Sequence, residues 1–264
     1  MDGEKLKMKK SVVIVIPIYK QEITADEKLS LIACCRVLGN YPIVFVCGKN
    51  LQTKTYEEII RTENCDFHKR TFADNNFKDI KGYNNFCLKS KFYKTFSKYK
   101  YMLLYQLDAC VFRDELQFWI ERDYDYIGAP WYNDRKGAVI PKDKLTLFGV
   151  GNGGFSLRKI SAISTLIKNP LSPFIKLSKS SPTLPCIKET MHAFLLKIIG
   201  KNEDIIIHRW GKAGLLKIPA EQDALGFAFD THPELSFRLN NEKLPFGCHA
   251  WIKSKQFWKN YIEW

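Results

Sequence analysis

Asp108 has the residue type and the position that chemistry at a ligand site requires. It follows the apolar run YMLLYQL, so its carboxylate lies at the end of a predicted strand. In open α/β sheets, ligands bind outside the carboxyl ends of the strands. A carboxylate there can hold a divalent cation, which in turn neutralises a diphosphate. The alternative is an Asp that caps the following helix, and the position alone favours neither.

A pair of adjacent acids, Glu203 and Asp204, begins a second apolar stretch. Such acids can supply a general base, which must reach the proton it removes. With Asn202 in front, they also fit a helix N-terminus, where Asn caps and negative charge suits the dipole. The capping interpretation is the commoner one. The literal D-x-D at Asp123 and Asp125 precedes a predicted strand, so we interpret it as a solvated turn.

Glycines and a histidine form two further candidates. The segment Gly151-Asn152-Gly153-Gly154 lets a ligand approach the backbone closely, or it forms a tight bend. Its spacing matches neither a Walker A loop nor G-x-G-x-x-G. His249 lies among aromatic residues and glycine in PFGCHAW, which is usually a structural setting. Imidazole can also complete a metal site or contact a diphosphate.

The elements that must position these residues indicate an α/β fold. The β-branched run at 11–18 predicts a strand buried on both faces. Thr24 and Glu27 form a capping box that opens a helix, which Gly39 ends. A second buried strand follows at 42–47. This order predicts a parallel sheet with right-handed crossovers.

The remaining pattern divides the chain into two halves. The front half continues with a helix, a strand, a polar loop, a helix and a strand at 57–61, 67–72, 73–85, 87–96 and 101–107. The back half is irregular, with Gly- and aromatic-rich strand-like runs at 124–132 and 147–158. Its basic segment 168–201 is interrupted by Pro and Ser, which predicts a flexible insertion. We therefore expect a charged tail at 1–10 and one domain at 11–264, divided at about residue 112.

The chain is strongly basic. Lys and Arg number 41 against 28 Asp and Glu, which gives a net charge of +13. This balance favours anionic partners: nucleic acid, an acidic membrane surface or phosphorylated substrates. Lysines are dense at 78–100 and recur at 168–201. Helix-turn-helix, zinc-finger and RNP patterns are absent from the sequence, so no nucleic-acid partner is expected.

The spacing of the cysteines and the hydropathy of the sequence indicate the cellular compartment of the protein. The eight cysteines form no C-x-x-C pair, and only Cys34 and Cys35 are close together, which favours a reducing, cytoplasmic setting. The N-terminal apolar run reaches Pro17 without a small-residue cleavage site, so it is a poor signal peptide. The uninterrupted apolar stretches of the sequence are all shorter than the roughly 18 residues that a membrane span requires. We expect a cytoplasmic protein, peripheral at the inner face of the membrane.

Seven short blocks together carry a resemblance to a known family. In order, between about Val12 and Trp258, they are VIVIPIYK, KGYNNF, YQLDACVF, YDYIGAPW, VGNGGFSLR, NED and LPFGCHAW. The chain resembles a bacterial family of predicted glycosyltransferases with the GT-A fold, long catalogued as a domain of unknown function. The resemblance implies a Rossmann-type mixed sheet flanked by helices. It also implies a nucleotide-binding half at about 11–112 and an acceptor-side, catalytic half at about 113–264.

The resemblance also implies roles for single residues. The nucleotide-sugar, with UDP as the expected nucleotide, would contact Pro17, Ile18, Tyr19, Lys81, Gly82, Tyr83, Asn84, Gln106, Asp108, Asn152, Gly153 and Gly154. Asp204 would be the general base of an inverting transfer, and Glu203 would position sugar hydroxyls. Asp108 and His249 would hold Mn²⁺ or Mg²⁺. Cys110 stands where many GT-A enzymes have the second acid of their D-x-D motif. The implied metal site therefore has one carboxylate ligand fewer than in those enzymes.

The implied acceptor is a saccharide or a lipid-linked glycan in the synthesis of bacterial surface polysaccharide or lipopolysaccharide. An anionic membrane surface would attract the basic chain. The alternative is a non-catalytic protein that binds anionic glycan or nucleic acid through its basic surface, with steep salt dependence. A nucleotidyltransferase is a third option, but a glycine-rich phosphate loop is missing after Ile18. The transferase is the favoured interpretation.

Overall fold

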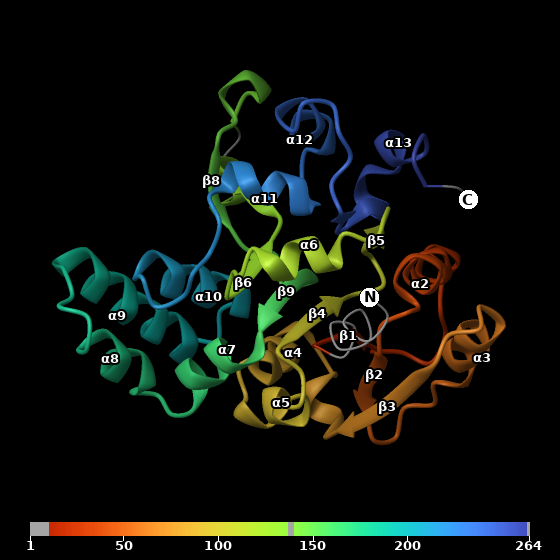
Figure 1. Cartoon of the computed structure of the whole chain (residues 1–264), viewed down its shortest axis with the longest axis horizontal. Helices are drawn as coiled ribbons and strands as arrows, with labels where there is room; N and C mark the ends of the chain where they lie inside the picture. Colours follow the sequence, from red (N-terminus) through yellow and green to blue (C-terminus); the bar gives the residue numbers. More distant parts are fainter. Residues whose placement is uncertain (1–10, 137–139, 263–264) are drawn as a thin grey trace.

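The centre of the computed structural model, which describes residues 11–136 and 140–262, is a six-stranded mixed sheet (Figure 1). Its order is β3-β2-β1-β4-β9-β6. The bounds are β1 (Val12–Pro17), β2 (Ile43–Gly48), β3 (Phe67–Phe72), β4 (Tyr101–Tyr105), β6 (Tyr126–Gly128) and β9 (Phe155–Lys159). The first four strands in that order are parallel, and β9 runs antiparallel to both of its neighbours.

The middle strands are buried on both faces, as their continuous apolar runs predict. Every residue of β1, β2 and β4 is buried. Because side chains alternate along a strand, Ile14 and Ile16 enter one core cluster, whereas Val13 and Val15 enter the other. The predicted mixed sheet with helices on both faces is confirmed.

Helices cover the two faces of the sheet. The first face packs against α2 (Ala25–Leu38), α3 (Lys54–Thr62) and α6 (Leu116–Glu121). The second face packs against α4 (Ile80–Cys87), α5 (Ser90–Thr95), α7 (Ile160–Ile167) and α10 (Glu203–Lys212). The predicted capping box of α2 is confirmed, since Thr24 Oγ1 accepts from the Glu27 N–H at 3.3 Å.

Two small sheets extend the fold beyond β4. One contains β10 (Ala228–Phe229), β11 (Gly247–Cys248) and β5 (Cys110–Val111) in that order, and the other is the hairpin of β7 (Pro130–Tyr132) and β8 (Leu147–Val150). Cys248 pairs with Cys110 across β11 and β5. This register brings the residue after β11 close to the segment between β4 and β5. Around these sheets lie α11 (Glu221–Phe227), α12 (Pro233–Leu239) and α13 (Lys255–Trp258).

The predicted flexible insertion at 168–201 is wrong. This segment forms α8 (Ser172–Leu177) and α9 (Leu184–Ile198), which pack on each other and, through α9, on α10. Pro173 and Pro185 occupy the first turns of these helices, where proline is tolerated. The prolines that we interpreted as interruptions therefore begin helices. Among the described residues, no helix is long and apolar enough to cross a membrane.

The predicted polar loop at 73–85 is also wrong in its second half. Ile80–Cys87 is α4, and the Asp79 side chain caps it by accepting from the Gly82 N–H at 2.6 Å. Gly and Asn have low helix propensity, but Tyr83 and Phe86 bury one face of this helix and outweigh that preference. The helix predicted at 87–96 is α5, which begins at Ser90 after a break. The predicted tail at 1–10 lies outside the described residues.

Candidate functional site

A cavity of about 980 Å³ lies where several strands of the fold end. Tyr19 follows β1, Gln106 follows β4, Asp230 follows β10 and His249 follows β11, and all four line it. A smaller cavity of about 220 Å³ shares Tyr19 and Gln106 with the larger one. Asp108 lines the smaller cavity. Both cavities therefore lie at the carboxyl ends of parallel strands, where ligands bind in open α/β sheets.

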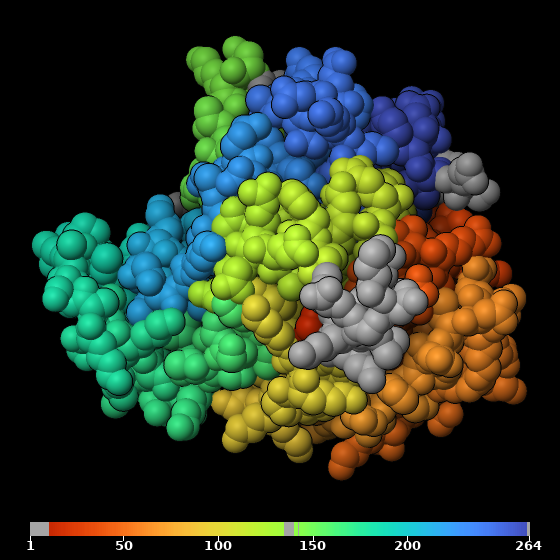
Figure 2. All heavy atoms as spheres, in the orientation of Figure 1, coloured from red at the N-terminus to blue at the C-terminus, as the bar shows by residue number. Residues whose placement is uncertain are grey.

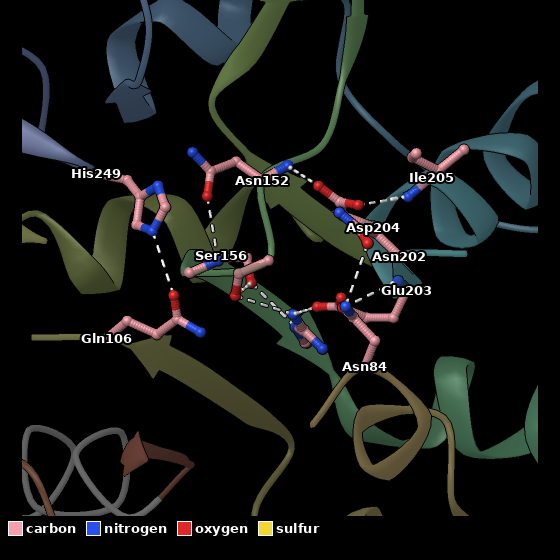
Figure 3. Close-up of polar contacts among 12 residues, drawn as sticks. Asn84, Gln106, Asn152, Ser156, Asn202, Glu203, Asp204, Ile205 and His249 are labelled. Carbon is pink, nitrogen blue, oxygen red and sulfur yellow. Dashed lines mark hydrogen bonds and ion pairs between the residues drawn. The ribbon is translucent and has the colours of Figure 1, made fainter. Parts of the chain in front are cut away.

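His249 lies between two carboxylates at the junction of the cavities. Its Nε2 atom is 3.1 Å from Asp108 Oδ1. The same atom is 3.3 Å from Gln106 Oε1 (Figure 3). Its Nδ1 atom is 3.3 Å from Asp230 Oδ1. The imidazole thus joins the ends of three strands, β4, β11 and β10.

The two carboxylates fix the charge of this histidine. Burial alone would lower the pKa of His249, but the hydrogen bonds and charges of Asp108 and Asp230 outweigh it and raise the pKa to about 10. Burial opposes ionisation of Asp108 in turn, yet His249 holds the pKa of that carboxyl below its ordinary value. The raised pKa of His249 and the lowered pKa of Asp108 both favour a charged pair, an imidazolium beside a carboxylate.

Asp230 is not among the site residues that we predicted from the sequence. It follows the apolar segment FAF, just as Asp108 follows an apolar strand. The strand-end rule that drew attention to Asp108 would therefore have found Asp230 as well. The strand itself, β10, has only two residues, which is why the pattern is weak.

Asp108 and His249, which we predicted as ligands of a divalent cation, lie side by side in the structure. Their donor atoms are 3.1 Å apart, a separation that two adjacent ligands of one cation also have. Carboxylate oxygen and imidazole nitrogen both suit Mn²⁺. In the part of the chain that the structure describes, no cluster of three or more His, Cys, Asp or Glu side chains could hold a metal ion. Cys110 is buried in a separate core cluster with Cys248, so this D-x-D position serves packing.

The N-terminus of α10 forms another wall of the larger cavity. Glu203 Oε1 lies 2.8 Å from Arg158 Nη2 in a buried ion pair. The same guanidinium donates to Tyr93 OH, Ser156 Oγ and Gly153 O. Burial raises the pKa of Glu203, and the positive charge of Arg158 opposes this rise. Arg158 ends the block VGNGGFSLR, and we predicted no role for it from the sequence.

The predicted cap of α10 is confirmed in position but differs in its bonds. Asn202 is the N-cap residue, yet its side chain makes no capping hydrogen bond. Its Oδ1 instead accepts from Asn84 Nδ2 at 3.2 Å, and Asn84 Oδ1 accepts from the Glu203 N–H at 3.4 Å. Asn84 therefore connects α4 to the start of α10.

Asp204 is held by the glycine-rich loop. Its Oδ2 accepts from the Asn152 N–H at 3.2 Å and its Oδ1 from the Ile205 N–H at 2.8 Å (Figure 3). Asn152 has a left-handed backbone with φ of 65°, and its Oδ1 accepts from the Gly154 N–H. The Asn152 Nδ2 atom is buried and has no hydrogen-bond partner among the described residues. Such an orphaned donor on a cavity wall suits a ligand oxygen.

Other side chains of the site pack closely against the α-carbons of Gly153 and Gly154. A Cβ atom on Gly153 would collide with Glu203, and one on Gly154 would collide with His249 and Gln106. The space beside both α-carbons is thus already filled by the residues of the site. Both glycines also line the larger cavity, so their contact with a donor sugar stays a prediction.

The other predicted donor contacts divide into two groups. Pro17 and Ile18 line the smaller cavity, while Tyr83 and Asn84 line the larger one. Lys81 and Gly82 line neither cavity. Both lie in the first turn of α4, within the segment that we predicted as a polar loop.

The D-x-D at Asp123 and Asp125 lies outside both cavities, as predicted. Asp123 is half exposed and pairs with Lys159 at 3.0 Å. Asp125 accepts from the Lys217 N–H at 2.9 Å. These acids stabilise surface turns.

Solved structures define the class of fold. The chain is similar to core-mannan synthase A (CmsA/Ktr4) from Aspergillus fumigatus, with a TM-score of 0.51 and 9% identity over 81% of this chain and 73% of that one. It is also similar to the glycosyltransferase GlyE of Streptococcus pneumoniae TIGR4, with a TM-score of 0.52 and 13% identity over 97% of this chain and 60% of GlyE. At these identities the likeness shows the fold, which is the GT-A-like α/β fold of these glycosyltransferases.

The family follows from the sequence itself. Residues 66–249 match the family described as "Protein of unknown function (DUF5672)", and the chain belongs to this family. A search of curated proteins finds no match. The chain spans 60% of the length of GlyE, so nothing about the whole of that protein transfers directly.

Proposed function

We propose that this protein is a glycosyltransferase that uses a nucleoside diphosphate sugar, with UDP as the expected nucleotide. The observation that carries the proposal is the position of Asp108 and His249 where two cavities adjoin, in a fold shared with glycosyltransferases. A nucleotide-sugar has three parts that need different surroundings: a nucleoside, a diphosphate and a sugar. Two adjoining cavities with a polar junction match that division.

The donor would lie across the junction. The smaller cavity, lined by Ile18, Tyr19 and Tyr56, offers rings and apolar surface to the nucleoside. The diphosphate would lie next to His249 and Lys253, and the sugar would extend toward Gly153 in the larger cavity. The orphaned amide of Asn152 would donate to a sugar or phosphate oxygen.

The local charges favour a cation together with the diphosphate. The negative charges of Asp108 and Asp230 offset the positive charges of His249 and Lys253. These four side chains together therefore do not neutralise the negative charge of a diphosphate. Asp108 and His249 would hold Mn²⁺ or Mg²⁺, which neutralises a diphosphate leaving group. To serve as a ligand, His249 must first release its Nε2 proton. The CmsA structure is a Mn/GDP form, which supports testing Mn²⁺ first.

Asp204 is the proposed general base. It lines the larger cavity, and its carboxylate is oriented by the N–H groups of Asn152 and Ile205. The acceptor hydroxyl would attack the anomeric carbon as the bond to the diphosphate breaks, and its proton would pass to Asp204. This single displacement inverts the anomeric centre. Glu203 would position sugar hydroxyls while its ion pair with Arg158 holds the start of α10 in place.

The acceptor we propose is a saccharide or a lipid-linked glycan of bacterial surface polysaccharide or lipopolysaccharide synthesis, modified at the cytoplasmic face of the membrane. The larger cavity, with Trp131 and Tyr132 on its wall, has room for a sugar acceptor beside the donor sugar. Aromatic rings are common partners for the apolar faces of sugars.

A thermal-shift panel tests the donor. UDP-, GDP-, CMP- and dTDP-sugars are each added with and without Mn²⁺. One class of nucleotide-sugar should raise the melting temperature of the protein, and more strongly when the metal is present. Asp108→Ala should abolish the shift. The matched control is Asp66→Asn, at an exposed residue that directly precedes the edge strand β3 and lines neither cavity. No shift with any donor would contradict the proposal and favour the non-catalytic binding protein.

A second measurement tests the base. Asp204→Asn should keep the donor-induced shift and lose sugar transfer by about 10²-fold or more. Unchanged turnover in this variant would remove Asp204 from the mechanism, and inversion would lose its support.

A further inference from the structure

The surface of α9 carries an exposed apolar stripe. Leu184, Ile187, Met191, Leu195 and Ile198 are 63%, 41%, 46%, 51% and 65% exposed. Their spacing of three and four residues places all five on one face of the helix. Single exposed apolar residues are ordinary, but a continuous helical stripe of them marks an interaction surface.

The fold does not need this stripe. The buried residues of α9 are Thr190 and Ala193, and this side of the helix packs against α10. Phe194 packs against Phe174 of α8, with ring centroids 5.7 Å apart. In Figure 1, α8 and α9 project from one end of the molecule, and Figure 2 shows them as a protruding lobe. Leu171, the N-cap residue of the neighbouring helix α8, and Ile175 within that helix are 60% and 52% exposed.

The charges around the stripe select its partner. Residues 168–201 contain six lysines and one acid, Glu189. That acid is paired with Arg209 at 2.8 Å. Lys168, Lys179, Lys188 and Lys201 are exposed. A second copy of this surface would bring like charges together, whereas anionic lipid headgroups complement the lysines while the bilayer boundary takes up apolar side chains.

We propose that the exposed faces of α8 and α9 dock the protein on a membrane that contains anionic lipids. The helix α9 lies in the plane of the interface, with its apolar stripe in the headgroup boundary and the lysines among the phosphates. The surface that docks is distinct from both cavities, since none of its residues lines them.

The docking surface ends beside the larger cavity. Lys201, just after α9, directly precedes Asn202 on the cavity wall. Ile80, which is 76% exposed, lines the same cavity from α4, a helix that contacts α10. A docked protein therefore holds this side of the cavity close to the lipid. This consequence rests on the proposed function, because it assigns the acceptor to the lipid-linked class.

Vesicle sedimentation tests the docking without any donor or acceptor. The full chain should bind vesicles of phosphatidylcholine with phosphatidylglycerol, and added salt should weaken the binding. Met191→Gln/Leu195→Gln should lower the partition coefficient about tenfold or more, because two exposed apolar side chains no longer enter the boundary. Leu239→Gln, at an exposed site on α12, is the matched control. Circular dichroism should show the same fold for all three proteins.

Two charge-reversing substitutions measure how much the lysines contribute to vesicle binding. Lys179→Glu/Lys188→Glu should weaken binding to the anionic vesicles, while Lys54→Glu on α3 should change little. Equal sedimentation of the wild type and the Met191/Leu195 variant would overturn the proposal. So would a wild-type dimer in light scattering that this variant abolishes, with no vesicle binding, since the stripe would then join two copies. Sugar transfer to a soluble acceptor without vesicle binding would overturn the docking proposal and leave the proposed function intact. Vesicle binding without affinity for any donor would contradict the proposed function and leave the docking proposal intact.

Discussion

The Nε2 atom of His249 lies 3.1 Å from Oδ1 of Asp108, and this ion pair joins the end of β11 to the end of β4. It exists because β5 and β11 pair in the small sheet, with Cys110 opposite Cys248. The two residues then meet at the junction of the two cavities, where a diphosphate would lie. The charge state of the site therefore depends on a contact between distant parts of the chain.

His249→Gln should change the pH dependence of stability. The pKa of His249 is raised from its ordinary 6.5 to about 10, so its contribution is fully present below pH 6.5 and is lost as the pH rises toward 10. The free energy of unfolding should fall by about 2–4 kcal/mol in the variant near pH 6 and by much less near pH 10. Urea unfolding across this range measures it, with the exposed His192→Gln as control. A constant difference at all pH values would contradict the assignment.

Asp230→Asn should lower the pKa of His249 by removing one of its two carboxylate partners. Asp230 Oδ1 is 3.3 Å from His249 Nδ1, on the side of the ring opposite Asp108. NMR titration of the His249 ring follows the shift directly. If the variant titrated as the wild type does, Asp230 would have no electrostatic role in the site.

Arg158→Met should destabilise the protein by about 3–5 kcal/mol, because it leaves the Glu203 carboxylate buried without its partner. Arg158→Met/Glu203→Gln should recover much of that loss, since no unpaired charge then remains. Urea unfolding of the single and double variants gives the coupling energy. Additive losses would show that the pair is not coupled.

Gly154→Ala should displace His249, because the added Cβ would collide with its ring and with the Gln106 side chain. We expect a loss of about 1–3 kcal/mol and a changed His249 NMR titration. Gly226→Ala is the matched control, since its Cβ would meet only Trp119 at 3.4 Å or more, and in helix α11 alanine is favoured over glycine. An unchanged melting temperature in Gly154→Ala would contradict the close packing of this loop.

Local patterns predicted those parts of the fold that depend on short segments. The apolar run at 11–18 predicted a strand buried on both faces, and Thr24 with Glu27 predicted the start of α2. Propensity failed where tertiary packing decided the outcome. In α4, the buried side chains of Tyr83 and Phe86 outweigh the poor helix propensity of Gly82 and its neighbouring asparagines.

The sequence by itself determined the α/β class and the strand-end position of Asp108, because hydrophobic periodicity and capping act over a few residues. Only the tertiary structure decided which groups meet that carboxylate. His249 and Asp230 reach it through the pairing of β10, β11 and β5, strands of two residues each that carry almost no periodic signal. The glycines of the loop likewise acquire their role from the Glu203 and His249 side chains that pack beside them. Long-range strand pairing, which no local pattern encodes, assembled the site.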